Sequence, residues 1–271
     1  MNIDLRTAGP DPSDLDARAD LCRDLALSAG RIALEGLGRA DRSFRLKGAQ
    51  DFLTETDAAV EDHLRAAIAA AFPGDAFLGE EGGGRPGRET WVVDPIDGTA
   101  NFARGVPHFC VSIAFVRDGA TEIGAICNPV LGELHFARRG AGVVRNGAPV
   151  RVAATSDFAA ACVELGWSNR VPNARYLEAM AALLELGANV RRGASGALGL
   201  AWVADGRSDG YAEAHMNAWD CLAGLLMVEE AGGRVGRFLE LGGLERGGPV
   251  IAAAPGIAEG FAAATGLALR A

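Results

Sequence analysis

The 271-residue chain has no surplus of basic residues, and this absence limits the partners it is expected to bind. It contains 26 Lys+Arg against 35 Asp+Glu, which gives a formal net charge of −9. The longest basic runs are the pairs Arg138-Arg139 and Arg191-Arg192, and neither makes a patch. Because proteins that hold a phosphate backbone usually carry a basic patch or stripe, the composition argues against a nucleic-acid binder.

Long hydrophobic runs are absent as well. No window of the chain approaches the roughly 18 uninterrupted apolar residues of a membrane-spanning helix. The segment Met1-Asn2-Ile3-Asp4 is not the basic start of a signal peptide. We therefore expect a cytoplasmic protein without membrane contact. Hydrophobic residues still make up 49% of the chain, so it can bury a full core.

Cysteine is scarce, and its spacing argues against several kinds of site. The cysteines are Cys22, Cys110, Cys127, Cys162 and Cys221. They include no C-x-x-C pair, so neither a disulfide framework nor a zinc knuckle is indicated, and we expect reduced, buried side chains. The chain also lacks a Cys-x₅-Arg phosphatase loop, a P-loop and a Gly-x-Ser-x-Gly turn. No histidines pair at metal-ligand spacing, although His215 is placed to line a substrate pocket near Glu213.

Hydrophobic residues at helical spacing predict two helices near the N-terminus. The first is expected to be capped by Ser13 and to stop at Gly36 and Gly38. The second is expected to be capped by Thr56 and to end at Phe72-Pro73-Gly74. Residues 110–152 then show short β-rich runs broken by turn residues, which is typical of an antiparallel meander.

The remainder of the chain alternates between strands and helices, which predicts an α/β (α+β) protein. The expected elements are a strand at 162–165, helices near 173–186, 195–204 and 219–231, and a strand at 249–253. A small-residue stretch at 154–160 suggests a boundary between two subdomains, residues 1–155 and 156–271, that act as one integrated catalytic unit.

The strongest local signal lies in residues 91–99, where an apolar strand ends in two carboxylates three positions apart. Pro95 stiffens the chain, so Asp94 and Asp97 are expected on the same side of a tight loop with the Ile96 carbonyl between them. Three hard oxygen donors of this kind suit Mg²⁺ or Mn²⁺. For the motif alone, an Asp-Pro turn in which Asp97 caps the next segment is the alternative.

Neighbouring residues suit a phosphate group and add further acids. Gly98 and Thr99 offer N–H groups and a hydroxyl where a helix begins, and such a terminus attracts phosphate. Glu80 follows an apolar run, and Asp220 opens an amphipathic helix. Because crowded carboxylates repel one another, one would be driven toward protonation unless a divalent cation neutralises them. The sequence therefore predicts adjoining metal and phosphate sites.

Taken together, these segments resemble the inositol monophosphatase family of Mg²⁺-dependent, Li⁺-sensitive phosphatases that act on sugar and polyol phosphates. The resemblance covers nearly the whole chain. The matching motifs are Asp94-Pro95-Ile96-Asp97-Gly98-Thr99-Ala100-Asn101-Phe102, Trp219-Asp220-Cys221-Leu222-Ala223-Gly224, Gly79-Glu80-Glu81 and Asp51-Phe52-Leu53-Thr54-Glu55-Thr56-Asp57. The resemblance implies a layered αβαβα sandwich and a homodimer.

The resemblance also implies a set of metal ligands. Glu80, Asp94 and the Ile96 carbonyl would bind a first ion, and Asp94, Asp97 and Asp220 would bind a second. Two or three Mg²⁺ ions are implied, with Mn²⁺ as an alternative cofactor and Li⁺ and Ca²⁺ as inhibitors.

Other residues are implied to act on the substrate. Gly98 and Thr99 would hold the phosphate, Asp57 and the Thr99 hydroxyl would orient the attacking water with Glu80 as a further catalytic residue, and Glu213 would bond substrate hydroxyls. We expect direct in-line attack by activated water, inversion at phosphorus and no covalent phosphoenzyme.

Asp97, Ser195 and Gly196 are further candidates for substrate contact. Family members have a Gly-Ser-Ala-Ala stretch beside the substrate, whereas this chain has Ala194-Ser195-Gly196-Ala197. The departure leaves the contacts of this stretch open.

Several alternatives share these motifs. The preferred activity is that of an inositol-1-monophosphatase, because Ala100-Asn101-Phe102 resembles that branch. Relatives acting on histidinol phosphate or 3′-phosphoadenosine 5′-phosphate tend instead to have a basic and then an aromatic residue after the Asp-Gly-Thr. Fructose 1,6-bisphosphate is a further candidate substrate. Haloacid-dehalogenase phosphatases differ by their Asp-x-Asp spacing. An alternative of another class is a regulatory protein that retains the fold, as some bacterial relatives act as binding partners in transcription.

Overall fold

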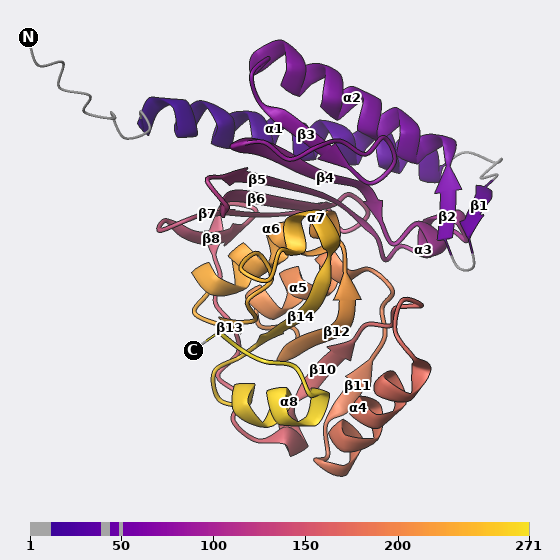
Figure 1. Cartoon of the computed structure of the whole chain (residues 1–271), viewed down its shortest axis with the longest axis vertical. Coiled ribbons are helices and arrows are strands. Elements are labelled where there is room, and N and C mark those ends of the chain that lie inside the picture. The colour runs from indigo at the N-terminus through magenta and orange to yellow at the C-terminus, as the bar shows by residue number, and fades with distance from the viewer. Residues whose placement is uncertain (1–11, 39–43, 49–50, 271) are drawn as a thin grey trace, which may run out of the picture.

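The computed structural model describes residues 12–38, 44–48 and 51–270, and these residues form five layers (Figure 1). The helices α1 (Pro12–Leu37) and α2 (Glu55–Ala71) form the first layer. Beneath them lies the first sheet, with the strand order β3-β4-β5-β6-β7-β8-β9. Its strands are β3 (Ala76–Gly79), β4 (Glu89–Asp97), β5 (Cys110–Arg117), β6 (Ala120–Asn128), β7 (Glu133–Arg138), β8 (Gly142–Arg145) and β9 (Ala148–Pro149).

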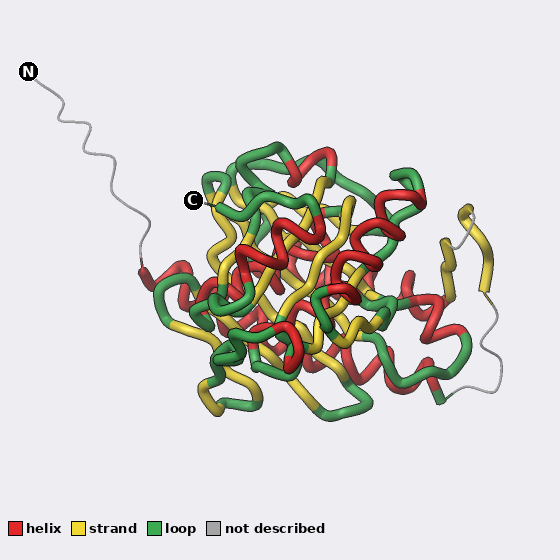
Figure 2. The backbone as a smooth tube through the Cα atoms, turned by 90° about the horizontal axis from the view of Figure 1, so that it is seen from below, coloured by secondary structure: helices red, strands yellow, loops and turns green. Residues whose placement is uncertain are grey.

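The middle layer holds α5 (Gly196–Ala204) and α6 (Ala218–Glu230), which pack between the first sheet and a second one. The second sheet has the order β11-β10-β12-β14-β13. Its strands are β10 (Cys162–Leu165), β11 (Asn189–Arg191), β12 (Gly210–Met216), β13 (Arg234–Val235) and β14 (Gly248–Ala253). The helices α4 (Asn173–Glu185) and α8 (Ala258–Thr265) cover its outer face (Figures 1 and 2). The predicted αβαβα sandwich is confirmed.

Shorter elements connect these layers. They are the hairpin of β1 (Phe44–Gly48) and β2 (Asp51–Thr54), the helices α3 (Thr99–Ala103) and α7 (Gly243–Arg246), and the 3₁₀ turn η1 (Phe158–Ala160). The chain passes from the first sheet to the second between β9 and β10. The predicted boundary after residue 155 falls in this connection, and the division into two subdomains stays a prediction.

The second N-terminal helix is confirmed, but Thr56 was the wrong cap. The helix α2 begins directly after Thr54, whose hydroxyl accepts the Asp57 N–H at 3.4 Å. The Asp57 carboxylate in turn accepts the Thr54 N–H at 2.8 Å. A capping box needs an acid three residues after the cap, and Thr54 satisfies this spacing whereas Thr56 does not.

The first helix is also confirmed, with different ends. It starts at Pro12, one residue before the predicted cap Ser13, and it continues through Gly36 to Leu37. A Cβ added at Gly36 would lie 2.4 Å from the Thr56 hydroxyl oxygen. This glycine therefore permits close contact between α1 and α2 and does not end the helix.

The predicted meander is confirmed in strands β5 to β9, which pair antiparallel in sequence order. Two of its turns need positive φ angles, namely Asp118-Gly119 (50° and 78°) and Asn146-Gly147 (49° and 81°). These angles match the twist of a two-residue hairpin. The predicted elements between residues 162 and 253 are likewise present, whereas β11, β12, β13, α7 and α8 had no counterpart in the prediction.

Burial explains the layer order. Helix α5 is buried along nearly its whole length because it lies between the two sheets. The cysteines Cys22, Cys110, Cys127 and Cys221 are buried as expected, whereas Cys162 is partly exposed, so the expectation of a buried side chain is wrong there. Among the residues that the structure describes, no helix combines the length and the apolar character needed to cross a bilayer.

Candidate active site

A cleft of about 310 Å³ brings together most of the predicted site residues. It is lined by the candidates Glu80, Asp97, Gly98, Thr99, Ser195, Gly196, Glu213 and Asp220. These residues come from the end of the first sheet, the start of α5, strand β12 and the start of α6. Residues more than a hundred positions apart in the sequence thus share one cavity.

Three aspartates form a compact group at this cleft. One carboxylate oxygen from each of Asp94, Asp97 and Asp220 lies within 4.8 Å of the others. Residues three apart in a regular strand point to opposite faces, yet Asp94 and Asp97 meet because the pairing of β4 with β5 shifts by a bulge between them. The predicted tight loop is therefore wrong in form, since both acids lie within a bulged strand end.

Asp97 holds the start of helix α5. Its carboxylate accepts the Ser195 hydroxyl at 2.5 Å, the Ala197 N–H at 2.8 Å and the Gly196 N–H at 3.2 Å. These donors and the helix dipole favour the ionised carboxylate. Asp97 of the first sheet thus forms hydrogen bonds with α5, the helix that lies between the first sheet and the second sheet.

Two other acids occupy equivalent positions on their own helices. Asp220 is the third residue of α6 and accepts the Asn217 N–H at 2.9 Å. Asp57 is the third residue of α2 and accepts the Thr54 N–H. Capping geometry therefore fixes both carboxylates at helix N-termini, where the dipole offsets part of the cost of burying a negative charge.

Burial and mutual repulsion make these acids reluctant to ionise without a cation. Burial raises the pKa of Asp94, and the charges of Glu80, Asp97 and Asp220 raise it further. Burial also raises the pKa of Asp220 and Asp97, in the latter case against the lowering effect of its hydrogen bonds. A divalent cation would relieve this cost, so the three aspartates could hold a metal ion.

Asp57 and Thr99 lie beside the aspartate group. The Thr99 hydroxyl donates to the Ile96 carbonyl at 2.9 Å and lies 3.4 Å from the Asp57 carboxylate. Burial raises the pKa of Asp57 to about 6, against the lowering effect of the bonds from Thr54. Gly98 precedes Thr99 with a φ of 98°, and a Cβ there would lie 3.1 Å from the His108 carbonyl oxygen.

Glu80 reaches the cleft from a loop that another acid anchors. The buried Glu61 of α2 accepts the N–H groups of Glu81 at 2.9 Å and Gly82 at 2.8 Å. A Cβ at Gly79 would lie 2.4 Å from the Glu61 carboxylate. Sequence reasoning missed Glu61, whose only signal is an acid on the apolar face of a predicted helix.

The sequence model of the Inositol monophosphatase family matches residues 14–267 of the chain. The chain belongs to the inositol monophosphatase family. It is 40% identical over 217 residues to the Nus factor SuhB of Xylella fastidiosa, which covers 79% of each chain. It is 38% identical over 216 residues to the inositol-1-monophosphatase of Mesorhizobium japonicum, with 78% of this chain and 81% of that protein covered.

Solved structures agree with this assignment. The extragenic suppressor protein suhB from Bartonella henselae superposes with a TM-score of 0.85 at 32% identity, over 92% of this chain and 98% of that one. Membership of the inositol monophosphatase family and the relatives named for that activity support a phosphatase with a phosphorylated substrate. Other relatives of similar identity carry the name Nus factor SuhB, so the names of the relatives do not agree on one specific activity.

The departure from the Gly-Ser-Ala-Ala stretch of the inositol monophosphatase family has a packing explanation. Ala194 adopts a φ of 59°, a conformation that costs an L-residue about 1 kcal/mol or more. A Cβ at Gly196 would lie 2.4 Å from the Met216 methyl group and 2.9 Å from the Tyr211 hydroxyl. The space that an alanine would fill at position 196 is therefore taken by Met216 and Tyr211.

Glu213 lies on the wall of the cleft together with residues that sequence reasoning missed. The Tyr211 hydroxyl donates to the Glu213 carboxylate at 2.6 Å, and burial raises the pKa of Glu213 to about 7. The buried Glu164 also lines the cleft and accepts the Gly193 N–H at 2.7 Å. Its signal in the sequence is a lone acid within an apolar strand. His215 lines the cleft, as the sequence suggested.

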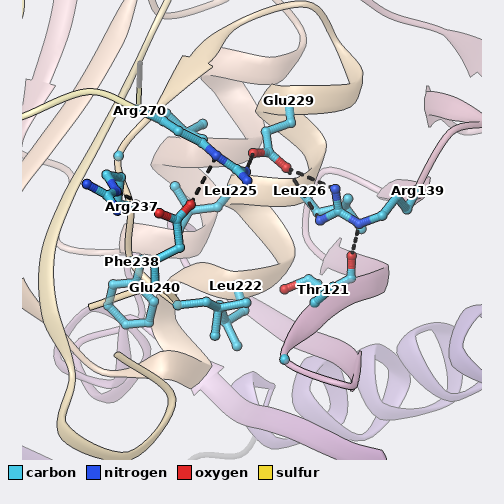
Figure 3. Close-up of a pocket in the computed structure, with 15 residues that line it drawn as sticks. Thr121, Arg139, Leu222, Leu225, Leu226, Glu229, Arg237, Phe238, Glu240 and Arg270 are labelled. Atoms are coloured by element: carbon cyan, nitrogen blue, oxygen red, sulfur yellow. Dashed lines mark hydrogen bonds and ion pairs between the residues drawn. The ribbon is translucent and has the colours of Figure 1, made fainter. Parts of the chain in front are cut away.

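A second cavity, here called the flank cavity, lies against α6 with a volume of about 190 Å³ (Figure 3). Its apolar lining is Leu222, Leu225, Leu226, Val235, Phe238 and Leu239. Its charged residues form one chain of ion pairs, which in order are Arg139, Glu229, Arg270, Glu240 and Arg237. None of the predicted site residues of this inositol monophosphatase family member lines it.

Proposed function

We propose that the protein is a Mg²⁺-dependent phosphate monoester hydrolase that acts on small polyol or sugar phosphates, with inositol 1-phosphate as the representative substrate. The observation that carries this proposal is the convergence of Asp94, Asp97 and Asp220 within 4.8 Å at a cleft. Family membership supports the reaction class.

The donor set fits a hard divalent cation. Asp94, Asp97 and Asp220 supply carboxylate oxygens, and Glu80 lines the same cleft. The Ile96 carbonyl accepts the hydroxyl of Thr99, which also lines the cleft. Oxygen-only ligands of this kind suit Mg²⁺ or Mn²⁺. When bound, such an ion neutralises phosphoryl oxygens, lowers the pKa of water and stabilises the departing alkoxide.

The residues of this chain then orient the reactants. The Asp57 carboxylate and the Thr99 hydroxyl hold the attacking water, and the Asp57 carboxylate receives its proton. The backbone around Gly98 and Thr99 receives the phosphate, and Glu213, fixed by Tyr211, bonds a substrate hydroxyl. No side chain acts as a nucleophile, so phosphorus inverts and no aspartyl-phosphate forms.

Phosphate release from a panel of esters tests the proposal. We expect hydrolysis of inositol 1-phosphate with Mg²⁺, activity with Mn²⁺, loss of activity in EDTA with recovery on adding Mg²⁺, and inhibition by Li⁺ and Ca²⁺. Histidinol phosphate serves as the competing monoester. A trapped aspartyl-phosphate, or activity unaffected by EDTA, would contradict the mechanism, and a much larger kcat/KM for histidinol phosphate would contradict the substrate preference.

A second candidate is a regulatory role in which the protein acts as a binding partner. The 40% identity to a protein named Nus factor SuhB favours it. An Asp94→Asn variant separates the two functions, because a cellular role that survives loss of phosphatase activity must rest on binding. The implied homodimer stays a prediction.

A further inference from the structure

Two arginines of the cleft stand apart from the ion pairs of the rest of the molecule. Arg170 and Arg192 both line the cleft, and both are exposed. Among the described residues, neither forms an ion pair with a carboxylate. In the flank cavity, by contrast, Arg139, Arg237 and Arg270 are all paired with glutamates. A cavity with guanidinium groups that lack carboxylate partners is prepared for an anion from outside the chain.

The sheet topology sets where these arginines lie. Strands β11, β10 and β12 are parallel neighbours, so their carboxyl ends meet at one edge. Arg192 follows β11, Arg170 lies in the loop after β10, and Glu213 lies on β12. Since neighbouring strands are about 4.8 Å apart, β11 is roughly 10 Å from β12. The arginines therefore occupy the end of the cleft beyond Glu213.

Aromatic contact holds one of the arginines in place. The Arg192 guanidinium carbon lies 5.7 Å from the centre of the Trp167 ring. Trp167 is itself fixed by donating from Nε1 to the Asn173 side-chain oxygen at 2.8 Å, and it also lines the cleft. The charges of Arg192 and Arg170 both lower the pKa of Glu213, in opposition to its burial, which supports their closeness to the substrate wall.

We propose that Arg170 and Arg192 form a subsite for a second anionic group of the substrate. Among the phosphate esters that the cleft accepts, it then favours those whose carbon chain carries a phosphate or a carboxylate at the end opposite the ester that is cleaved. This inference rests on the proposed phosphatase function and specifies its substrate class. The reacting phosphate lies at the aspartate group, and Glu213 contacts the substrate hydroxyls between the two ends of the ester. The guanidinium groups of the two arginines donate hydrogen bonds to the anion at the far end.

Three six-carbon polyol esters with the same chain test the subsite. Sorbitol 6-phosphate has a neutral far end, sorbitol 1,6-bisphosphate has a second phosphate there, and 6-phosphogluconate has a carboxylate. We expect kcat/KM for the two esters with a second anionic group to exceed that of sorbitol 6-phosphate by about tenfold or more, mainly through a lower KM. The bisphosphate and the carboxylate arms distinguish the two chemical sources of the far anion.

Variants assign the preference to the arginines. In the double variant Arg170→Gln/Arg192→Gln we expect the preference to fall to about twofold or less, because the far anion loses its charged donors. The double variant Arg170→Lys/Arg192→Lys keeps both charges and should retain part of the preference. The matched control Arg151→Gln/Arg175→Gln removes two exposed charges outside the cleft that likewise pair with no carboxylate among the described residues, and it should keep the full preference.

Three results would overturn the subsite. The first is an equal kcat/KM for all three esters in the wild-type enzyme, and the second is an unchanged preference in Arg170→Gln/Arg192→Gln. The third is an equal fall of kcat/KM in that variant for esters with and without a second anion, which would indicate general steering of anions. If the enzyme hydrolyses neither the three esters nor inositol 1-phosphate, the proposed phosphatase function is overturned and the subsite with it.

Discussion

Two cavities touch helix α6 and differ in how their charges are paired. In the active-site cleft, Asp94, Asp97 and Asp220 crowd together, and the charge of Asp97 raises the pKa of the other two. Arg170 and Arg192 lie at the same cleft without carboxylate partners among the described residues. In the flank cavity, each arginine meets a glutamate over an apolar floor (Figure 3). The flank arginines are neutralised within the chain and serve the fold, whereas the two cleft arginines are left for the anionic group that we propose they bind.

The two arginine pairs of the sequence show that this difference is tertiary. Arg138-Arg139 and Arg191-Arg192 look alike in the sequence. Arg139 enters the flank cavity and bonds Glu229, whereas Arg192 stacks near Trp167 in the cleft. Exposed ion pairs contribute only about 0–1 kcal/mol each, so the flank pairs matter little individually.

The largest expected effect is on kcat/KM, which a substitution in the active-site cleft should lower and a substitution in the flank cavity should not. We expect Asp94→Asn to lower kcat/KM by at least ~10³-fold, because it removes a carboxylate from the aspartate group and with it a metal ligand. The fold should survive, since one repelling buried charge is lost. Glu229→Gln, the matched variant in the flank cavity, should change kcat/KM by less than about twofold.

Phosphate-release kinetics and thermal unfolding of both variants check this prediction. A large loss of activity in Glu229→Gln with an intact fold would mean that the flank cavity takes part in catalysis. Full activity in Asp94→Asn would remove the aspartate group from the mechanism.

A smaller effect concerns the metal-free protein. Mg²⁺ at about 100 times its Kd should stabilise the fold by about 2.7 kcal/mol, and this should raise Tm by roughly 5–10 °C for a chain of this size. The reason is that the cation relieves the repulsion among Asp94, Asp97 and Asp220. Differential scanning fluorimetry with and without EDTA measures it. Asp94→Asn should lose most of the shift, and Glu229→Gln should keep it.

The smallest effect is a pH dependence of opposite sign in the two cavities. Burial raises the pKa of Glu213 from 4.5 to about 7, so its contribution to the stability of the metal-free protein is present below pH 4.5 and is lost as pH rises toward 7. The hydrogen bond from Arg237 lowers the pKa of Glu240, whose contribution is present above pH 4.5 and is lost as pH falls.

Glu213→Gln keeps an acceptor for Tyr211 and should stabilise the metal-free protein at pH 8 by about 1–2 kcal/mol, with a flatter slope between pH 4.5 and 7. Glu240→Gln should leave that slope unchanged. Urea unfolding in EDTA at several pH values provides the measurement. Equal slopes in the wild type and Glu213→Gln would show that Glu213 is not the group responsible.

Much of the fold could be predicted because local patterns decided it. Hydrophobic periodicity located α1 and α2, and Asp118-Gly119 and Asn146-Gly147 located hairpin turns that need positive φ. Predictions of helix ends were wrong where a neighbouring segment decided the role of the residue. Gly36 was predicted to end α1, but it instead allows α1 to approach Thr56. Strand β12 was missed because its mixed polarity reflects the cleft on one side and the core on the other.

The candidate site was predictable to the extent that it lies in contiguous motifs. Asp94, Asp97 and Asp220 were found because acids follow apolar runs and sit beside helix starts. Glu61, Glu164 and Tyr211 were missed, since each acts through a partner distant in sequence. A lone acid in an apolar segment signals burial but does not identify what it will bond.

The sequence by itself determined the mixed α/β class and the acidic motifs, because periodicity, turn chemistry and motif spacing are local properties. The family, and the layered architecture that it implies, followed from the resemblance that those motifs carry. The tertiary structure alone decided that a bulge turns Asp94 and Asp97 to one side, that Asp97 caps α5, and which arginines pair with glutamates. Charge pairing and close packing depend on distances between segments remote in the chain, and those distances exist only after folding.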